Sequence, residues 1–265
     1  MSSFFLSFSF VLGIIIGSFL NVVSFRYNTG MTLNGRSKCF SCGKNLLWYE
    51  LIPIFSFLFQ KGKCKKCKSK ISWQYPIIEI LAGLMFLMIF YVFPPTTFAN
   101  SIQTLFYIFI TCILLVITIY DIRHKIIPDA LSYTFSTLAL LHLFISPDLS
   151  IVIPSWLSLL SGPILALPFI LLWLISKGKW MGLGDGKIVF GIGWLLGFNL
   201  AISAIILAFW IGSVISIVWM YIVFKKIKSK YEIPFGPYLI LGMYLVLLFG
   251  IQVIDLTPFM EYFYI

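Results

Sequence analysis

The sequence predicts an all-α polytopic membrane protein with about eight transmembrane helices and a small cytoplasmic loop that carries four cysteines. Of its 265 residues, 60% are hydrophobic and only 11% are charged, and the mean hydropathy is +1.02. A soluble domain carries about 25% charged residues. A chain of this composition cannot cover a water-facing surface, so we expect the lipid bilayer to be its main solvent.

Eight apolar segments alternate with polar loops. They lie at residues 4–25, 76–93, 101–120, 129–145, 151–175, 188–198, 200–224 and 238–254. Most are long enough to cross about 30 Å of hydrocarbon. Segment 188–198 is the exception, because a helix of that length rises only about 16 Å. We expect it to borrow residues from its flanks or to thin the membrane locally.

The basic residues predict the orientation of these segments. All 19 Lys and Arg fall within residues 26–70, 123–125, 177–187 and 225–230. Positively charged loops stay in the cytoplasm, and an eight-span trace puts every cluster on one side, whereas a seven-span trace does not. We therefore expect an external N-terminus, a cytoplasmic cysteine loop and an external acidic C-terminus with Asp255 and Glu261. The net charge of +10 then reflects topology, and we expect no nucleic-acid partner.

Two CxxC pairs lie in the basic loop. Cys39 and Cys42 form the first pair, Cys64 and Cys67 form the second, and 21 residues separate the pairs. This spacing can supply four thiolates to a tetrahedral structural Zn²⁺. Two disulfides or four free thiols are the alternatives, and a cytoplasmic location disfavours disulfides. The loop has too few apolar residues to fold alone, which favours zinc.

Two of the nine acidic residues adjoin apolar segments on the predicted cytoplasmic side. Asp121 ends the third segment, and Asp185 lies in the glycine-rich sequence 182–187. Ionisable groups at membrane depth are costly, so they are candidates for function. Glycines beside Asp185 remove Cβ atoms, which would allow a peptide backbone to approach closely.

A pair of carboxylates that meet can catalyse hydrolysis. The pair cannot ionise fully and holds one shared proton, so one member accepts a proton from water while the other donates one to the scissile carbonyl. The alternatives are that Asp121 forms an ion pair with Arg123 or Lys125, and that residues 182–186 form a plain loop.

These features together resemble the bacterial prepilin peptidases (type IV leader peptidases), a family of GxGD-type intramembrane aspartyl proteases. The resemblance covers most of the chain, and its motifs occur in the family's order. They are Gly17–Val23, the two CxxC pairs, Gly62–Cys64, Tyr75-Pro76 with Glu79, Asp121 with Pro128-Asp129, Gly182–Lys187 and Pro234–Pro237.

The resemblance implies a peptidase of the bacterial cytoplasmic membrane. It would cleave prepilins or pseudopilins on the cytoplasmic side, after the glycine that precedes their hydrophobic stalk, with Asp121 and Asp185 as the catalytic pair. Motif residues that would support the substrate or the catalytic pair are Gly182, Gly184, Lys187, Pro234 and Gly236.

The resemblance also implies a second activity. Family members with the cysteine loop methylate the new N-terminal residue with S-adenosylmethionine. We therefore expect residues 1–93 to form the methyltransferase part, with Glu50, Gly62 and Glu79 associated with that activity, and residues 94–265 to form the protease part. No glycine motif for a cofactor is visible.

Two other functional classes remain open from the residues alone. A proton-coupled transporter could use Asp121 and Asp185 as a relay, although no internal repeat of the kind found in such transporters is visible. A membrane-anchored zinc scaffold without catalysis is the other class. The sequence does not indicate the oligomeric state or which pilin system supplies the substrate.

Overall fold

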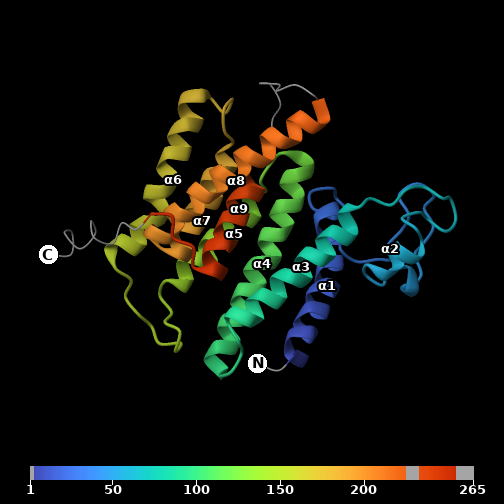
Figure 1. Ribbon diagram of the computed structural model, residues 1–265, viewed down its shortest axis with the longest axis horizontal. Helices are drawn as coiled ribbons and strands as arrows, with labels where there is room; N and C mark the ends of the chain where they lie inside the picture. Colours follow the sequence, from blue (N-terminus) through green and yellow to red (C-terminus); the bar gives the residue numbers. More distant parts are fainter. Residues whose placement is uncertain (1–2, 225–232, 255–265) are drawn as a thin grey trace. The chain divides into compact units, whose positions relative to one another are not determined.

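The computed structural model describes residues 3–224 and 233–254, and its regular structure in this part of the chain is helical (Figure 1). The predicted basic cluster at residues 225–230 and the acidic residues Asp255 and Glu261 lie outside the described residues. The helices are α1 (Ser3–Arg26), η1 (Trp48–Glu50), α2 (Phe55–Phe59), α3 (Gln74–Val92), α4 (Phe98–His124), α5 (Asp129–His142), α6 (Trp156–Ser176), α7 (Leu183–Leu196), α8 (Phe198–Phe224) and α9 (Gly236–Phe249).

Each of the eight apolar segments corresponds to one helix, and the prediction of a helical membrane protein is confirmed. Five of the described helices are long and apolar enough to cross a membrane, namely α1, α3, α4, α6 and α8. The other three, α5, α7 and α9, have 14 residues each and rise about 21 Å. The number of helices that span the bilayer therefore stays a prediction.

The chain divides into two compact units, Met1–Val116 and Ile117–Ile265. In the first unit, α1 lies beside α3 (Figure 1). Small residues make this close approach possible, because a Cβ on Gly13 would lie 2.6 Å from the Ala82 carbonyl oxygen and one on Gly17 would lie 2.8 Å from Ala82 Cβ. This spacing of glycines is typical of membrane helices that pack backbone to backbone. The predicted functional division at residues 93 and 94 is not tested by the structure.

In the second unit, α7 lies among α5, α6, α8 and α9 (Figure 1). The helix begins at Leu183, so it does borrow residues from the segment before Ile188. Most of its residues are buried, including Ile188, Val189 and Ile192, none of which has measurable exposure. Neighbouring helices therefore cover most of α7, which would allow a short helix to lie within a bilayer.

Candidate functional sites: an aspartate pair and a four-cysteine cluster

The two candidate catalytic aspartates are buried in the second unit. Asp121 lies in the last turn of α4 and is 4% exposed, and Asp185 lies in the first turn of α7 and is 7% exposed. The Ile127 side chain lies against both Gly236, which adjoins Asp121 Oδ2, and Gly184, which precedes Asp185, so both aspartates lie around this one side chain. Within the described residues Asp121 forms no ion pair, and its Oδ2 atom has no hydrogen-bond partner. These observations therefore do not support the alternative of an ion pair between Asp121 and Arg123 or Lys125.

Glycines bring the surrounding elements close to the pair. A Cβ on Gly236, the first residue of α9, would lie 2.7 Å from Asp121 Oδ2 and 3.2 Å from the Ile127 side chain. A Cβ on Gly184 would lie 2.7 Å from the same Ile127 side chain. Ile127 thus fills the space between the starts of α7 and α9. On the side where its Cβ would point, Gly184 is covered by the Ile127 side chain, and the approach of a peptide backbone to Asp185 stays a prediction.

Gly182 and Pro234 frame the two helix starts. Gly182 is the N-cap of α7, and a Cβ there would lie 3.7 Å from Asp185 Oδ2, which is ordinary van der Waals distance. Pro234 lies in the non-helical segment before α9. An acidic residue in the first turn of a helix is stabilised by the helix dipole, so the start of α7 favours a carboxylate at Asp185.

Lys187 points to α5. Its Nζ lies 2.6 Å from Asp129 Oδ1 and 4.9 Å from the centre of the Tyr133 ring. The Ser136 hydroxyl donates to the Lys187 carbonyl oxygen at 3.2 Å. These contacts connect α5 to α7 one turn from Asp185. Sequence reasoning had not included Asp129 or Ile127 among the site residues. No local sequence pattern marks Ile127.

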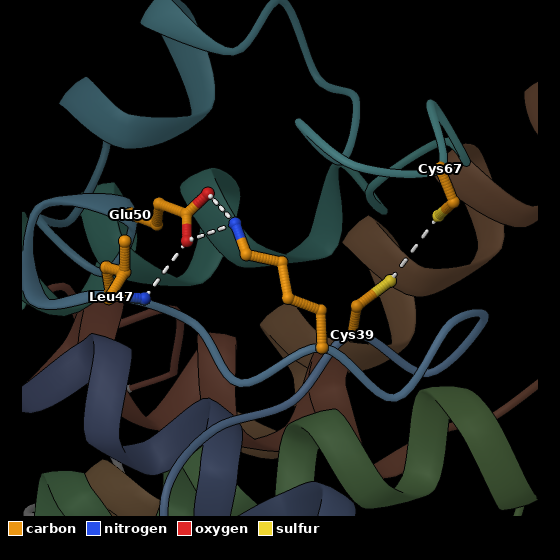
Figure 2. A network of polar contacts seen from close by, with 5 residues as sticks. Cys39, Leu47, Glu50 and Cys67 are labelled. Atoms are coloured by element: carbon orange, nitrogen blue, oxygen red, sulfur yellow. Dashed lines mark hydrogen bonds and ion pairs between the residues drawn. The ribbon is translucent and has the colours of Figure 1, made fainter.

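The four predicted metal ligands form one cluster in the first unit. The ligand sulfurs of Cys39, Cys42, Cys64 and Cys67 all lie within 4.8 Å of one another, and none forms a disulfide. Cys39 Sγ lies 3.8 Å from Cys67 Sγ (Figure 2). A tetrahedron with Zn–S bonds of about 2.3 Å has edges of about 3.8 Å, so the donor set fits Zn²⁺.

The two CxxC turns share one backbone pattern. In the first, Cys39 N–H donates to the Lys44 carbonyl and Gly43 N–H donates to the Cys39 carbonyl. In the second, Cys64 N–H donates to Ser69 and Lys68 N–H donates to Cys64. Both turns are closed by an isolated antiparallel bridge. Because the two turns have the same backbone pattern, each directs its two cysteine sulfurs toward the same point.

Backbone amides favour the thiolate at part of the cluster. The Cys42 N–H and then the Ser41 N–H lower the pKa of Cys39 to about 6. The backbone amide of Lys44 also favours the Cys42 thiolate, but burial and the neighbouring Cys39 and Cys67 raise the pKa of Cys42 to about 11. A bound metal would displace the protons that such a cluster retains.

Glu50 is part of the framework of the first CxxC turn. Its carboxylate accepts hydrogen bonds from the Leu47 N–H at 3.0 Å and from Lys44 Nζ at 3.0 and 3.1 Å (Figure 2). The Leu47 amide, followed by Lys44, lowers the pKa of Glu50. The ionised Glu50 carboxylate therefore connects η1 to Lys44, the residue whose carbonyl closes the first CxxC turn.

Gly62 and Glu79 are engaged with other segments. Gly62 has a φ of +64°, and a Cβ there would lie 3.1 Å from the Phe57 ring. Glu79 is buried on α3, and its Oε2 accepts from the Ile54 N–H at 2.7 Å. Ile54 has a φ of +61°, a strained conformation for a branched side chain. Glu79 therefore stabilises a turn of the loop from the start of a membrane helix.

The fold and the two clusters define a helical membrane protein that has a buried aspartate pair in one unit and a four-cysteine loop in the other. Comparison with known proteins assigns both parts. Residues 11–93 match the Bacterial Peptidase A24 N-terminal domain, and residues 108–217 match the Type IV leader peptidase family. The chain belongs to the type IV leader peptidase family.

Curated relatives support this assignment along nearly the whole chain. A Bacillus subtilis (strain 168) protein named prepilin leader peptidase/N-methyltransferase is 29% identical over 258 residues, which cover 94% of this chain and 96% of the relative. A Pseudomonas aeruginosa protein of the same name is 29% identical over 92% of this chain and 90% of its own length. A Myxococcus xanthus relative of that name reaches 46% identity over 80 residues, or 30% of this chain and 24% of its own length. No solved structure matches.

Proposed function

We propose that the protein removes leader peptides from prepilins or pseudopilins, with Asp121 and Asp185 as the catalytic pair. The cut would fall after the glycine that precedes the hydrophobic stalk. The observation that carries this proposal is the burial of two carboxylates, on α4 and α7, beside glycines that both pack against Ile127. Family membership and the names of the full-length relatives support it over a proton-coupled transporter.

The pair would act as general base and general acid. The ionised carboxylate takes a proton from water as the water oxygen bonds to the glycine carbonyl carbon, and the protonated carboxylate donates its proton to the carbonyl oxygen. The tetrahedral intermediate then breaks its C–N bond. The proton first taken from water passes to the leaving nitrogen, and one hydroxyl of the intermediate returns a proton to the second carboxylate as the new carboxyl group forms. Gly184 and Gly236 allow the starts of α7 and α9 to pack closely beside the pair. Gly182 is the N-cap of α7, Pro234 precedes α9, and Lys187 anchors α7.

We further propose that the cysteine loop serves the methylation of the new N-terminus. Zn²⁺ bound by Cys39, Cys42, Cys64 and Cys67 would stabilise the loop. S-adenosylmethionine, when bound, supplies a methyl group to the neutral N-terminal amine. Glu50, Gly62 and Glu79 would act in this part by holding the loop in shape, as their contacts with Lys44, Phe57 and Ile54 support.

The proposed location is the bacterial cytoplasmic membrane, with the N-terminus outside and the cysteine loop in the cytoplasm. The apolar helices and the family support a multi-pass protein of this membrane. The orientation rests on the positions of the Lys and Arg residues. The lipid bilayer and prepilin substrates are the expected partners.

A cleavage assay tests the proposal. Purified protein in detergent is incubated with a prepilin and S-adenosylmethionine, and the mass of the product reports cleavage and methylation together. We expect Asp121→Asn and Asp185→Asn each to reduce cleavage by about 10²–10⁴-fold, the range for loss of a general acid or base. Methylation of a pilin that is already cleaved should persist in both variants. Undiminished cleavage in either variant would exclude the pair.

A further inference from the structure

The cysteine loop exposes several large apolar side chains. Phe59 is 83% exposed, Phe55 is 60% exposed and Leu58 is 59% exposed, all on the short helix α2, and Trp73 is 67% exposed. Clustered apolar exposure on a small polar loop indicates a surface that contacts another molecule or a membrane.

A groove lies beside α2. It has a volume of about 440 Å³, and its lining includes the apolar side chains of Phe57, Leu58 and Trp73. The Phe57 and Trp73 rings pack edge to face, with centroids 4.8 Å apart. Three lysines, Lys61, Lys63 and Lys70, also line it. We call this site the lysine groove.

The positive charge of the lysine groove is not balanced by the protein. An antiparallel bridge joins Lys63 to Lys70, and like charges directly opposite each other are unfavourable. In residues 3–224 and 233–254, none of its three lysines forms an ion pair with a carboxylate. The nearby acidic residue Glu50 is already paired with Lys44. The groove therefore has the chemistry of an anion site.

The groove also adjoins the start of a helix that can cross the membrane. Trp73 immediately precedes α3 (Gln74–Val92), one of the helices long and apolar enough to cross the membrane. Tryptophan side chains concentrate at the membrane–water interface, and basic pockets at the ends of membrane helices bind anionic headgroups. A sulfonium-bearing methyl donor fits less well, because three lysines would repel its positive centre.

We propose that the lysine groove binds the phosphate headgroup of an anionic phospholipid, and so holds the cysteine loop against the leaflet at which α3 begins. The phosphate oxygens would meet the lysine ammonium groups, and the glycerol and upper acyl chain would lie against Leu58 and Trp73. This inference does not depend on the peptidase or methyltransferase proposal.

Lipid binding to the full-length protein tests the inference. The protein is purified in a neutral detergent, and native mass spectrometry measures binding of short-chain phosphatidylglycerol and phosphatidylcholine. We expect phosphatidylglycerol to bind at least about tenfold more tightly. The double variant Lys63→Gln/Lys70→Gln should bind it about thirtyfold more weakly, given the contribution of each lysine near an anionic lipid.

A matched control removes the same charge from the same loop. Lys66 and Lys68 are exposed and lie outside the groove lining, so Lys66→Gln/Lys68→Gln should keep near-native binding. Lys63→Arg/Lys70→Arg should also bind, and zinc content reports whether each variant retains a folded loop. Equal binding of both lipids, or equal losses in the two Gln pairs with zinc retained, would overturn the proposal. Tight binding of free glycerol phosphate or displacement of the lipid by equimolar S-adenosylmethionine would also overturn it.

Discussion

The aspartate pair and the cysteine cluster are held in place by different forces. Around the aspartates, close packing sets the geometry, because Ile127 fills the space between Gly184 and Gly236. Around the cysteines, backbone hydrogen bonds and the Glu50–Lys44 pair set the geometry of turns that are largely exposed. The aspartate site is therefore sensitive to the addition of a single methyl group. The cysteine cluster is sensitive to the loss of a metal ligand or a polar contact.

This difference separates the two proposed activities. A packed site among helices tolerates little change of volume. A small loop with few apolar residues gains much of its stability from metal binding. Changes at one site should therefore leave the activity of the other largely intact, and the following experiments can sharpen or break this contrast.

The largest of these effects is expected at Gly236. A Cβ in Gly236→Ala would lie 2.7 Å from Asp121 Oδ2, closer than real Cβ contacts, so the carboxylate or α9 must shift. A displacement of this kind costs about 100-fold in rate, and kcat/KM for prepilin cleavage measures it. Gly182→Ala is the matched control, since its Cβ would lie 3.7 Å from Asp185 Oδ2 and should change the rate about twofold at most. If Gly236→Ala cleaves prepilin at the wild-type rate, close packing does not determine the positions of the two carboxylates.

Removal of the metal should give the next largest effect, at the other site. Chelation or Cys64→Ser should release zinc and reduce methylation of a cleaved pilin at least about tenfold, since loss of metal-site contacts costs about 10–100-fold. Cleavage should fall less. Cys112→Ala is the control, because Cys112 lies on α4 outside the cluster. Zinc-free protein that methylates normally would refute the structural role of the metal.

Glu50 offers a smaller test of what holds the cysteine loop. Glu50→Gln removes the charge from a side chain that is 1% exposed, but it keeps the side-chain volume and an oxygen that can accept from the Leu47 N–H. We expect methylation to fall about fivefold, together with zinc affinity, and to recover in excess zinc. If methylation is lost while zinc affinity is unchanged, Glu50 has a direct role in the reaction and not a framework role.

The fold was predictable where it depends on hydropathy. Eight apolar segments gave eight helices, with ends displaced by a few residues. One such displacement is at α7, which begins at Leu183 and not at Ile188. Hydropathy marks the lipid-compatible part of a segment, whereas the glycines and Asp185 enter this helix because neighbouring helices bury them.

The site was predictable in its residue types but not in its contacts. The GxGD sequence and the CxxC spacing identified Asp185 and the four cysteines, and local spacing also sets the cluster of sulfurs. The sequence does not state that Ile127 fills the space beside Gly184, or that Lys187 pairs with Asp129. These are contacts between segments that are distant in the sequence, and such contacts depend on tertiary packing that no local pattern encodes.

The Lys187–Asp129 pair carries the smallest expected effect, and it tests how far packing alone fixes the aspartates. The Lys187 side chain is 15% exposed and the Asp129 side chain is 69% exposed, so solvent screens their attraction. We expect Lys187→Met and Asp129→Asn each to slow cleavage about threefold, with no further loss in the double variant because both remove one interaction. Lys187→Arg should restore most of the rate, and methylation of a cleaved pilin should not change. If the cleavage rate falls more than about 100-fold in Lys187→Met but not in Asp129→Asn, Lys187 contacts the substrate. Loss of the exposed ion pair with Asp129 alone would cost far less than that.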